Sequence, residues 1–460
     1  MIIRKKTNIP DHYYSRKTNK RAFHFKLGLF VALISNLVVG WGVNSGEDIT
    51  NSRANFLSTG RNNFLGSFAG FAYGKVPNNP LNWWQVLLLT QGLLAALGLY
   101  LLFRNKLNSC SKRSLITLQA YCFISIHLGM ALTRDGAMIS LALFGFSLLN
   151  FNPKRLQIRL LGLLTLIIAF GFRPWLGVCL APLLYLLFQS SLVKSKLLAS
   201  VLALFISLAP AGLEALTASA SNIEDAFPQQ TFMLHDLASS YCLSTNQSTR
   251  DAAFSELARN TNSGISILQI CEFYKPSTWQ SIILPNKGDA RISKLEAPIR
   301  IIQPGDLNNF NQLQNSWMRI IKKDPSSYLQ NHLYFLSQVL ISGESRALTL
   351  PQVISQFTSL IEAQEVFKLL CAFIQTPAEL LVRLHIISPA ITIVGLVILF
   401  LRKRELVNNR YVAASAQTLA LWVIITTAGF VSDNGRYTYL PVLIVWGTII
   451  YQKNAKAIQV

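Results

Sequence analysis

The sequence is poor in charged residues. Only 14% of its 460 residues are Asp, Glu, Lys or Arg, against about 25% in an ordinary soluble domain. Hydrophobic residues make up 51% of the chain, and its mean hydropathy is +0.36. This composition excludes an ordinary soluble globular domain and indicates a polytopic membrane protein.

Paired cysteines and repeated segments are also lacking. The six cysteines are scattered, without a Cys-x-x-Cys pair and without a His and Cys spacing typical of zinc ligands. The sequence therefore supports neither a structural zinc site nor a dithiol redox motif. It contains no visible internal repeat, which disfavours a transporter built from inverted repeats.

Acidic residues are half as frequent as basic ones, 21 against 42, which gives a net charge of +21. Nucleic-acid binding requires a basic face on a soluble domain. Here most basic residues lie between apolar runs instead. We interpret them as membrane-topology signals and predict no nucleic-acid partner.

Ten apolar runs are long enough, or nearly so, to cross the roughly 30 Å hydrocarbon layer as helices. They are Leu27–Val43, Asn82–Phe103, Ser114–Leu132, Ala137–Phe151, Leu156–Phe172, Trp175–Leu192, Leu197–Leu216, Ile386–Leu401, Tyr411–Val431 and Tyr437–Tyr451. The sequence thus predicts an all-α polytopic membrane protein with about ten transmembrane helices. A large, mostly helical extracytoplasmic region separates helices seven and eight.

The distribution of basic residues predicts the orientation. With the amino terminus inside, the cytoplasmic segments together carry 23 Lys and Arg, and the short outer connections carry 6. The positive-inside rule therefore places both termini in the cytoplasm. The first run is also compatible with a signal peptide, but its basic region is long and no clear cleavage site follows.

Three parts are expected along the chain. Residues 1–216 form a seven-helix membrane module, with an outer loop at 44–81 whose apolar residues recur at helical spacing and predict an amphipathic helix on the membrane surface. Residues 217–376 form the extracytoplasmic region, with helices predicted at 251–260, at 313–323 and from Pro325 towards Ser342. Residues 377–460 contain a re-entrant segment and three membrane helices.

Charged residues gather at the turns on the predicted outer side. They are Glu47, Asp48, Arg134, Asp135, Arg173 and Arg436. Each turn alone has a plain explanation, because outer turns are polar and a local Arg134–Asp135 ion pair would close its own turn. Together they suit a ligand that needs a carboxylate base and arginines against phosphate oxygens.

Four short motifs carry a family resemblance. They are the acidic pair after the first run, the turn Thr133–Met138, the turn Phe172–Trp175 and the late turn Asp433–Pro441. With seven spans before a large outer region, these motifs resemble the polytopic GT-C class of glycosyltransferases. That resemblance implies transfer of a sugar from a polyprenyl-phosphate-linked donor to a cell-envelope glycan or glycolipid acceptor, on the outer face of a bacterial inner membrane.

The resemblance also implies residue roles. Asp48, and next Glu47, would act as the base or orient the acceptor, with Asp135 as a second acid or metal ligand. Arg436, Arg173 and Arg134 would hold the phosphate. The Glu47–Asp48 pair is not an Asp-x-Asp motif, so a divalent metal is possible but not implied.

Two further predictions concern the outer region. His235 and Asp236 are candidates for binding the acceptor. Cys242 and Cys271 are predicted to form a disulfide, because an oxidising compartment allows them to pair. The alternatives to a glycosyltransferase are an envelope polysaccharide polymerase or ligase, and a non-catalytic membrane transporter or scaffold.

Overall fold

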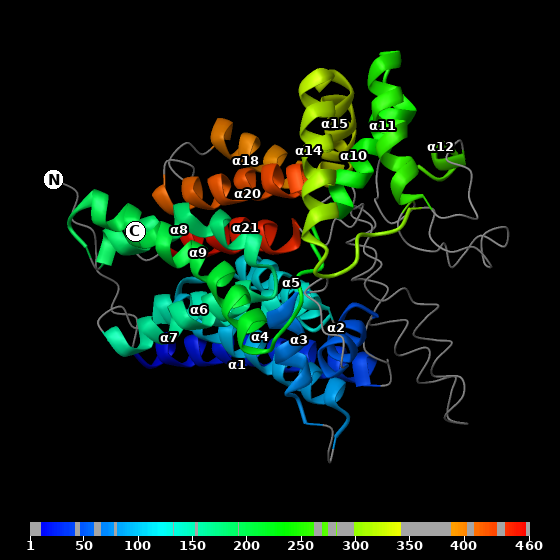
Figure 1. Ribbon diagram of the computed structural model, residues 1–460. Coiled ribbons are helices and arrows are strands. Elements are labelled where there is room, and N and C mark those ends of the chain that lie inside the picture. The colour runs from blue at the N-terminus through cyan, green and yellow to red at the C-terminus, as the bar shows by residue number, and fades with distance from the viewer. Residues whose placement is uncertain are drawn as a thin grey trace, which may run out of the picture.

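The part of the protein described by this computed structural model is mostly helical (Figure 1). The structure describes residues 11–41, 47–58, 66–77, 81–131, 133–151, 155–191, 193–261, 269–274, 282, 299–341, 388–402, 409–429 and 438–456. Within these ranges no strand is found, and an isolated β-bridge joins Thr261 to Ile299. The all-α prediction is therefore confirmed, while Arg436 and the predicted re-entrant segment lie outside the described residues.

A bundle of apolar helices forms the larger part of the molecule. Its amino-terminal helices are α1 (Asp11–Trp41), α4 (Trp83–Phe103), η1 (Arg104–Ser109), α5 (Lys112–Gly129), α6 (Arg134–Phe151), α7 (Leu156–Gly171), η2 (Pro174–Leu180), α8 (Ala181–Ser191) and α9 (Lys196–Ala220). Three carboxyl-terminal helices complete it: α18 (Pro389–Arg402), α20 (Arg410–Gly429) and α21 (Tyr439–Lys456). The helix α1 begins well before the first apolar run, so much of the predicted basic tail is helical.

Polar residues at the bundle's turns define where several helices begin. The Oγ of Ser111 accepts a hydrogen bond from the backbone N–H of Ser114 at the start of α5. At the start of α4, Gln85 accepts from the backbone N–H of Asn82. These contacts satisfy backbone donors that have no partner within the first helical turn.

Glycines allow the central helices α4, α6 and α7 to approach closely. A Cβ on Gly98 of α4 would lie 2.8 Å from the backbone nitrogen of Phe144 on α6. On the other side of α6, a Cβ on Gly145 would lie 3.1 Å from the carbonyl oxygen of Gly162 on α7. Small residues at such crossings are typical of helices packed in a membrane, where van der Waals contact supplies much of the association energy.

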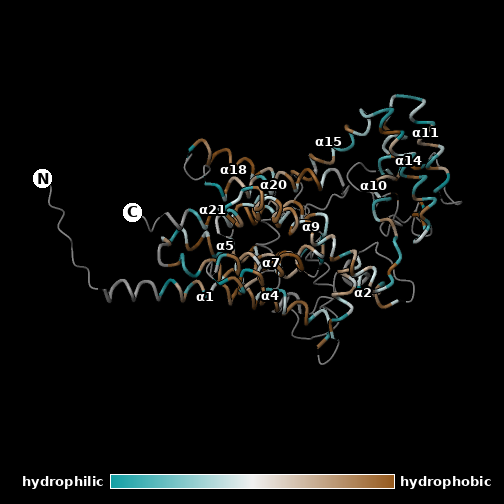
Figure 2. The backbone as a smooth tube through the Cα atoms, turned by 60° about the vertical axis from the view of Figure 1, so that its left-hand side comes forward, coloured by the Kyte–Doolittle hydropathy of each residue, from teal (hydrophilic) through white to brown (hydrophobic). Residues whose placement is uncertain are grey.

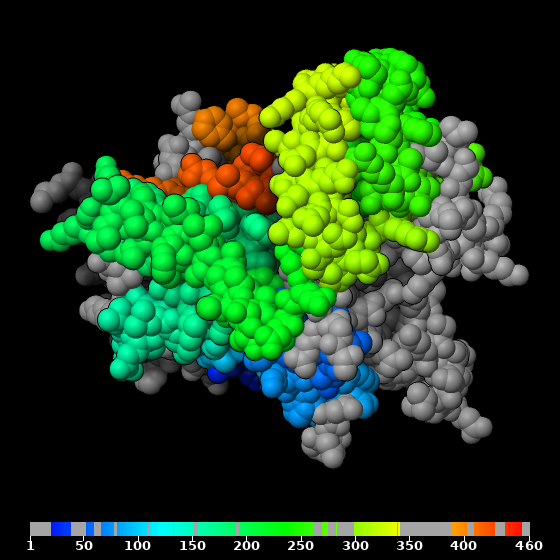
Figure 3. All heavy atoms as spheres, viewed as in Figure 1, coloured from blue at the N-terminus to red at the C-terminus, as the bar shows by residue number. Residues whose placement is uncertain are grey.

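Two of the described helices, Trp83–Leu107 and Lys196–Ala220, are long and apolar enough to cross a membrane, by length and composition alone. Further apolar helices are shorter: Leu156–Gly171, Pro174–Gln189, Pro389–Arg402 and Tyr439–Gln452. The helix α9, green in Figure 3, exposes Leu197, Val201, Leu204, Phe205 and Leu208 along one stripe. An exposed apolar stripe of this kind is compatible with contact to lipid.

A second hydrophobic core lies outside the bundle. It belongs to α10 (Gln230–Leu243), α11 (Gln247–Asn260), α12 (Ile270–Phe273) and α14 (Leu307–Lys323), which we call the α10–α14 domain. The predicted helices at 251–260 and 313–323 lie within α11 and α14. A disulfide joins Cys242 at the end of α10 to Cys271 in α12, as predicted.

The helix α15 (Pro325–Ile341) connects the two cores. Asp324 precedes it and accepts hydrogen bonds from Ser326 and Ser327 at its first turn and from Ser244 of the domain. These hydrogen bonds lower the pKa of the Asp324 carboxyl. Further along, Phe335 and Val339 of α15 are buried in the core of the bundle.

The loop 44–81 departs from the prediction of one surface helix. Its described part forms two short helices, α2 (Glu47–Leu57) and α3 (Ser67–Gly74), which pack on each other through Phe56 and Phe71. The helix α3 is apolar on all sides and largely buried, and a helix of that composition belongs inside a core rather than at an interface.

Figures 1 and 2 place α2 and the α10–α14 domain at the same end of the bundle. The first residues of α1 and the last of α21 lie at the opposite end. In Figure 2 the tube of the bundle is predominantly brown, whereas that of the domain is mixed with teal. The molecule therefore has one end with α2 and the more polar α10–α14 domain, and an opposite end with the start of α1 and the end of α21.

We predict that Gly98→Ala destabilises the protein, because its Cβ would press on the backbone of α6. Overpacking of this kind costs about 1–3 kcal/mol, and it should lower the thermal unfolding midpoint of the purified protein. Gly212→Ala in α9 is the matched control, since a Cβ there meets nothing within 4 Å. Equal midpoints for the two variants would contradict the close α4–α6 contact.

Candidate functional site

The amino terminus of α3 is held by a carboxylate from a distant helix. Glu214, near the end of α9, accepts hydrogen bonds from the backbone N–H groups of Ser67 and Phe68, the second at 2.9 Å. Gly66 precedes them with a φ of +89°, which a glycine adopts without strain. A carboxylate at a helix amino terminus is stabilised by unpaired N–H groups and by the helix dipole.

The carboxyl end of α3 is held by an arginine. Arg53 of α2 donates from Nη1 to the carbonyl oxygens of Tyr73 and Val76, the latter at 3.0 Å. Its guanidinium also lies 4.9 Å from the centre of the Trp83 ring, at the start of α4. Both ends of this short helix are therefore fixed by charged side chains from other elements.

Asp135 and Arg173 form a buried ion pair. Nε of Arg173 donates to Oδ1 of Asp135 at 2.9 Å, and Nη2 donates to Oδ2 at 3.0 Å. The side chains are only 8% and 3% exposed. The pair joins the first turn of α6 to the turn between α7 and η2, and a two-pronged arginine–carboxylate contact of this kind fixes geometry as well as charge.

Arg134 lies beside the same place. Its Nη1 is 3.6 Å from where a Cβ on Gly66 would lie, and its side chain is half-buried. The ring of Phe172, next to Arg173, contacts Phe68 and Tyr73 of α3 at centroid distances of 5.3 and 5.4 Å. The starts of α3 and α6, the end of α7 and the end of α9 therefore meet, and we call this meeting point the α3 corner.

Three of the predicted site residues come together at the α3 corner: Arg134, Asp135 and Arg173. Asp135 forms an ion pair with Arg173, which is distant in the sequence. The sequence suggests only a local pair between Asp135 and Arg134. Glu47 and Asp48 begin α2, but their side chains lie outside the described part, as does all of Arg436. Their roles stay predictions.

Sequence reasoning missed Glu214. A signal was present, because it is the one acidic residue in the 25-residue helix α9. A carboxylate near the end of such an apolar helix requires a partner, but its partners are backbone N–H groups, which no residue pattern reveals.

His235 and Asp236 lie elsewhere, inside the α10–α14 domain. Asp236 is 2% exposed and accepts hydrogen bonds from Trp317 at 3.0 Å, Asn331 at 3.3 Å and His332 at 3.1 Å. His235 is fully buried, with its ring 5.0 Å from that of Tyr274. The predicted acceptor-binding role does not fit this geometry, because both side chains are enclosed by protein.

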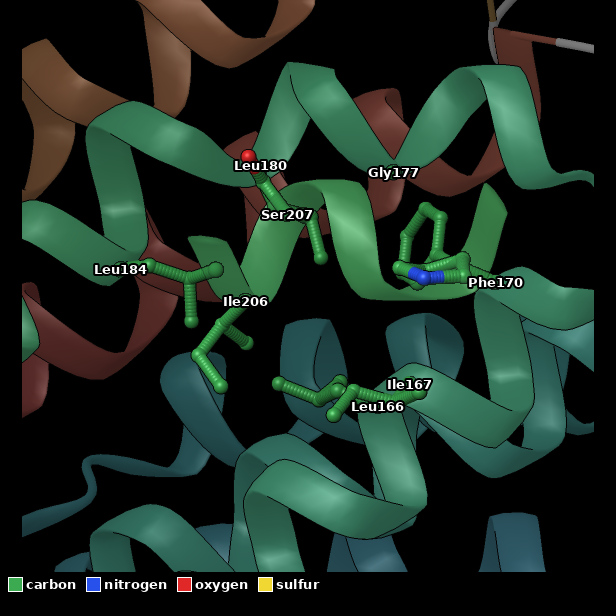
Figure 4. A pocket seen from close by; sticks show the side chains of 9 residues that line it. Leu166, Ile167, Phe170, Gly177, Leu180, Leu184, Ile206 and Ser207 are labelled. Atoms are coloured by element: carbon green, nitrogen blue, oxygen red, sulfur yellow. The ribbon is translucent and has the colours of Figure 1, made fainter. Parts of the chain in front are cut away.

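No metal centre is evident in the described ranges. No group of three His, Cys, Asp or Glu side chains there is arranged to hold a metal ion. A small cavity lies between α7, η2, α8 and α9, and Figure 4 shows apolar side chains such as Leu166, Leu184 and Ile206 around it. None of its lining residues ionises, so it offers no acid–base chemistry.

No known protein family, no curated protein and no solved structure matches this chain. The indications of function therefore come from the residues at the α3 corner and from the short sequence motifs that contain them.

We predict that Asp135→Asn and Arg173→Gln are each strongly destabilising, because either leaves an uncompensated buried charge. The loss should be about 3–5 kcal/mol for each single variant. The double variant removes both charges, so its loss should be clearly smaller than the sum of the two. Denaturant unfolding of the purified protein measures all three.

The ion pair between Arg259 and Glu256 is the control, because its arginine side chain is 56% exposed, although the Glu256 side chain is only 7% exposed. Arg259→Gln should cost roughly 1 kcal/mol or less. Strictly additive losses for Asp135→Asn and Arg173→Gln would show that the two side chains do not act as a pair.

Proposed function

We propose that this protein is a membrane glycosyltransferase that moves a sugar from a polyprenyl-phosphate-linked donor to a cell-envelope acceptor. The protein spans a bacterial inner membrane about ten times, with both termini in the cytoplasm and the α3 corner on the outer face. Support comes from the ten apolar runs, the excess of basic residues in the expected cytoplasmic segments and the polar end of the bundle.

The observation that carries the proposal is the meeting of Arg134, Asp135, Arg173 and Glu214 at one corner. These residues come from three separate elements, namely α6, the turn after α7, and α9, and their charges are held at the end of an apolar bundle. The phosphate of a lipid-linked donor lies at the membrane surface, level with the end of the apolar bundle, while its polyprenyl chain stays among the apolar helices. Arginine is suited to such a headgroup because its fork matches phosphate oxygens.

The reaction requires a base and a stabilised leaving group. A carboxylate, Asp48 or Glu47, accepts the proton of the acceptor hydroxyl as its oxygen bonds to the anomeric carbon. The bond from that carbon to the phosphate oxygen breaks, and polyprenyl phosphate leaves with the electron pair. Arg134 and Arg436 stabilise that phosphate. Asp135 instead pairs with Arg173 and so fixes the first turn of α6, which carries Arg134.

Glu214 has a positioning role in this proposal. Its carboxylate is committed to two backbone N–H groups of α3, so both of its oxygens are engaged in holding that helix. By holding the first turn of α3 it keeps Gly66 beside Arg134. A divalent metal, should one take part, would require the carboxylates of Glu47 and Asp48.

An envelope polysaccharide polymerase or ligase requires the same groups and differs in its acceptor. A transporter is the second candidate, because the bundle contains a polar contact between Asn36 of α1 and Nδ1 of His127 of α5, 2.8 Å apart. Polar side chains within membrane helices often mark transport pathways. Transfer of the sugar to a soluble acceptor analogue would identify an enzyme, whereas movement of the intact lipid-linked sugar across the bilayer would identify a transporter.

We predict that Arg134→Gln lowers kcat/KM for sugar transfer by roughly 100-fold, the scale of losing one preorganised group against developing charge. Arg134→Lys should recover part of the loss, because it keeps the charge without the planar fork. The assay uses the full chain in liposomes, a polyprenyl-phosphate sugar donor and mass-spectrometric detection of the product. Asp48→Asn and Arg436→Gln should also lose activity.

Arg250→Gln, on the exposed face of α11, is the control and should keep the wild-type rate. Unchanged rates in the Arg134, Asp48 and Arg436 variants together would reject the site. A lipid-linked sugar that crosses the bilayer unmodified would instead support the transporter.

A further inference from the structure

The ring of His332 lies where α15 passes from the α10–α14 domain to the bundle. Nε2 is 3.1 Å from Oδ1 of Asp236 in the domain, and Nδ1 is 2.8 Å from the carbonyl oxygen of Thr427 in the last turn of α20. The side chain is 7% exposed. One imidazole therefore contacts both folding units at once.

Both partners of the ring are acceptors. A backbone carbonyl can only accept, and both oxygens of Asp236 already receive N–H groups, from Trp317 on one side and Asn331 on the other. Tyr274 in turn donates to Oδ1 of Asn331 at 2.7 Å, which fixes the Asn331 amide so that its NH₂ group faces Asp236. The geometry therefore requires a hydrogen on each ring nitrogen, which is the charged form of histidine.

Burial works against this charge and by itself lowers the pKa of His332. The hydrogen bond and the negative charge of Asp236, together with the Thr427 carbonyl, act the other way, and the pKa of His332 is raised above its usual value. The electrostatic balance thus agrees with the requirement set by the two acceptors.

Few other titratable groups face the ring in the part of the chain described. Tyr328, one turn earlier on α15, lies 4.1 Å from it between ring centres, and burial raises the pKa of its hydroxyl. His235 of α10 and Tyr274 after α12 lie behind Asp236 and contact each other. From α14 comes the neutral Trp317, and from α20 the Thr427 carbonyl. Asp236 is therefore the group that compensates the charge of His332.

We propose that His332 is a pH-sensitive clamp between the α10–α14 domain and α20, which holds both while charged and releases Thr427 when neutral. A neutral imidazole carries one N–H only. That hydrogen stays on Nε2, because a carboxylate is a stronger acceptor than a backbone carbonyl. The hydrogen bond that is lost is therefore the one from Nδ1 to the Thr427 carbonyl of α20, and the contacts within the domain remain.

The direction of the pH dependence follows from the sign of the shift. A group whose pKa is raised by folding stabilises the folded arrangement fully below its usual value, about 6.5 for histidine. That contribution disappears as the pH rises through the raised pKa. Because the pair is buried, the transition should depend little on salt.

The clamp is independent of the proposed sugar transfer, and its test does not measure activity. Protein with isotope-labelled histidine is placed in liposomes, and the ring nitrogens are followed by solid-state NMR against pH. The chain has six histidines, and the His332 signals are those that His332→Gln removes. We expect both ring nitrogens to remain protonated above pH 6.5, and Asp236→Asn to move this titration to lower pH.

Hydrogen exchange of the last turn of α20 gives the structural readout. After correction for intrinsic rates, exchange should increase roughly tenfold as His332 loses its proton, the scale of one hydrogen bond to a charged group. His332→Gln should exchange fast at every pH, and Asp236→Asn should shift the step. The Cys242–Cys271 disulfide, verified by mass spectrometry, shows that each variant has folded.

His24→Gln, at an exposed position of α1, is the control and should leave the step in place. A His332 ring that titrates at or below pH 6.5 would overturn the proposal. So would an exchange rate in α20 that does not respond to the protonation of His332.

Discussion

A charge buried among apolar helices must be paired, and the contact between Asp135 and Arg173 meets this constraint at the α3 corner. Either charge alone would be expensive at that position, so the first turn of α6 and the turn after α7 are held in one relative position. The aromatic ring of Phe172 follows the same turn and packs on α3. The arrangement of the α3 corner therefore depends on this single ion pair.

The corner also depends on close helix packing behind it. Gly98, Gly145 and Gly162 allow the backbones of α4, α6 and α7 to come into contact. This close packing fixes the position of α6 and therefore of Arg134 and Asp135 in its first turn. Arg53 and Glu214 then hold the two ends of α3. Charged side chains here act mainly on backbone groups and on each other, and Arg53 and Arg134 are both half-buried.

The α10–α14 domain follows a different principle. It has its own hydrophobic core and a disulfide, and it meets the bundle through α15. In this helix Asn331 and His332 contact Asp236 of the domain, and Phe335 and Val339 lie in the bundle core. The polar network around Asp236 lies at this transition. A network of satisfied polar groups specifies one geometry more narrowly than apolar packing does, which suits a junction between two separately folded parts.

The sequence by itself determined the helical class, the approximate limits of most helices, a region separate from the apolar helices, the disulfide pair and three residues of the α3 corner. These follow from hydrophobic periodicity, turn residues and composition, which are properties of neighbouring positions in the chain. Only the tertiary structure decided that Asp135 pairs with Arg173, that Glu214 binds the start of α3, and that Asp236 faces His332. Those contacts join residues 38, 147 and 96 positions apart, and the partner of a buried charge depends on which helix ends meet in space.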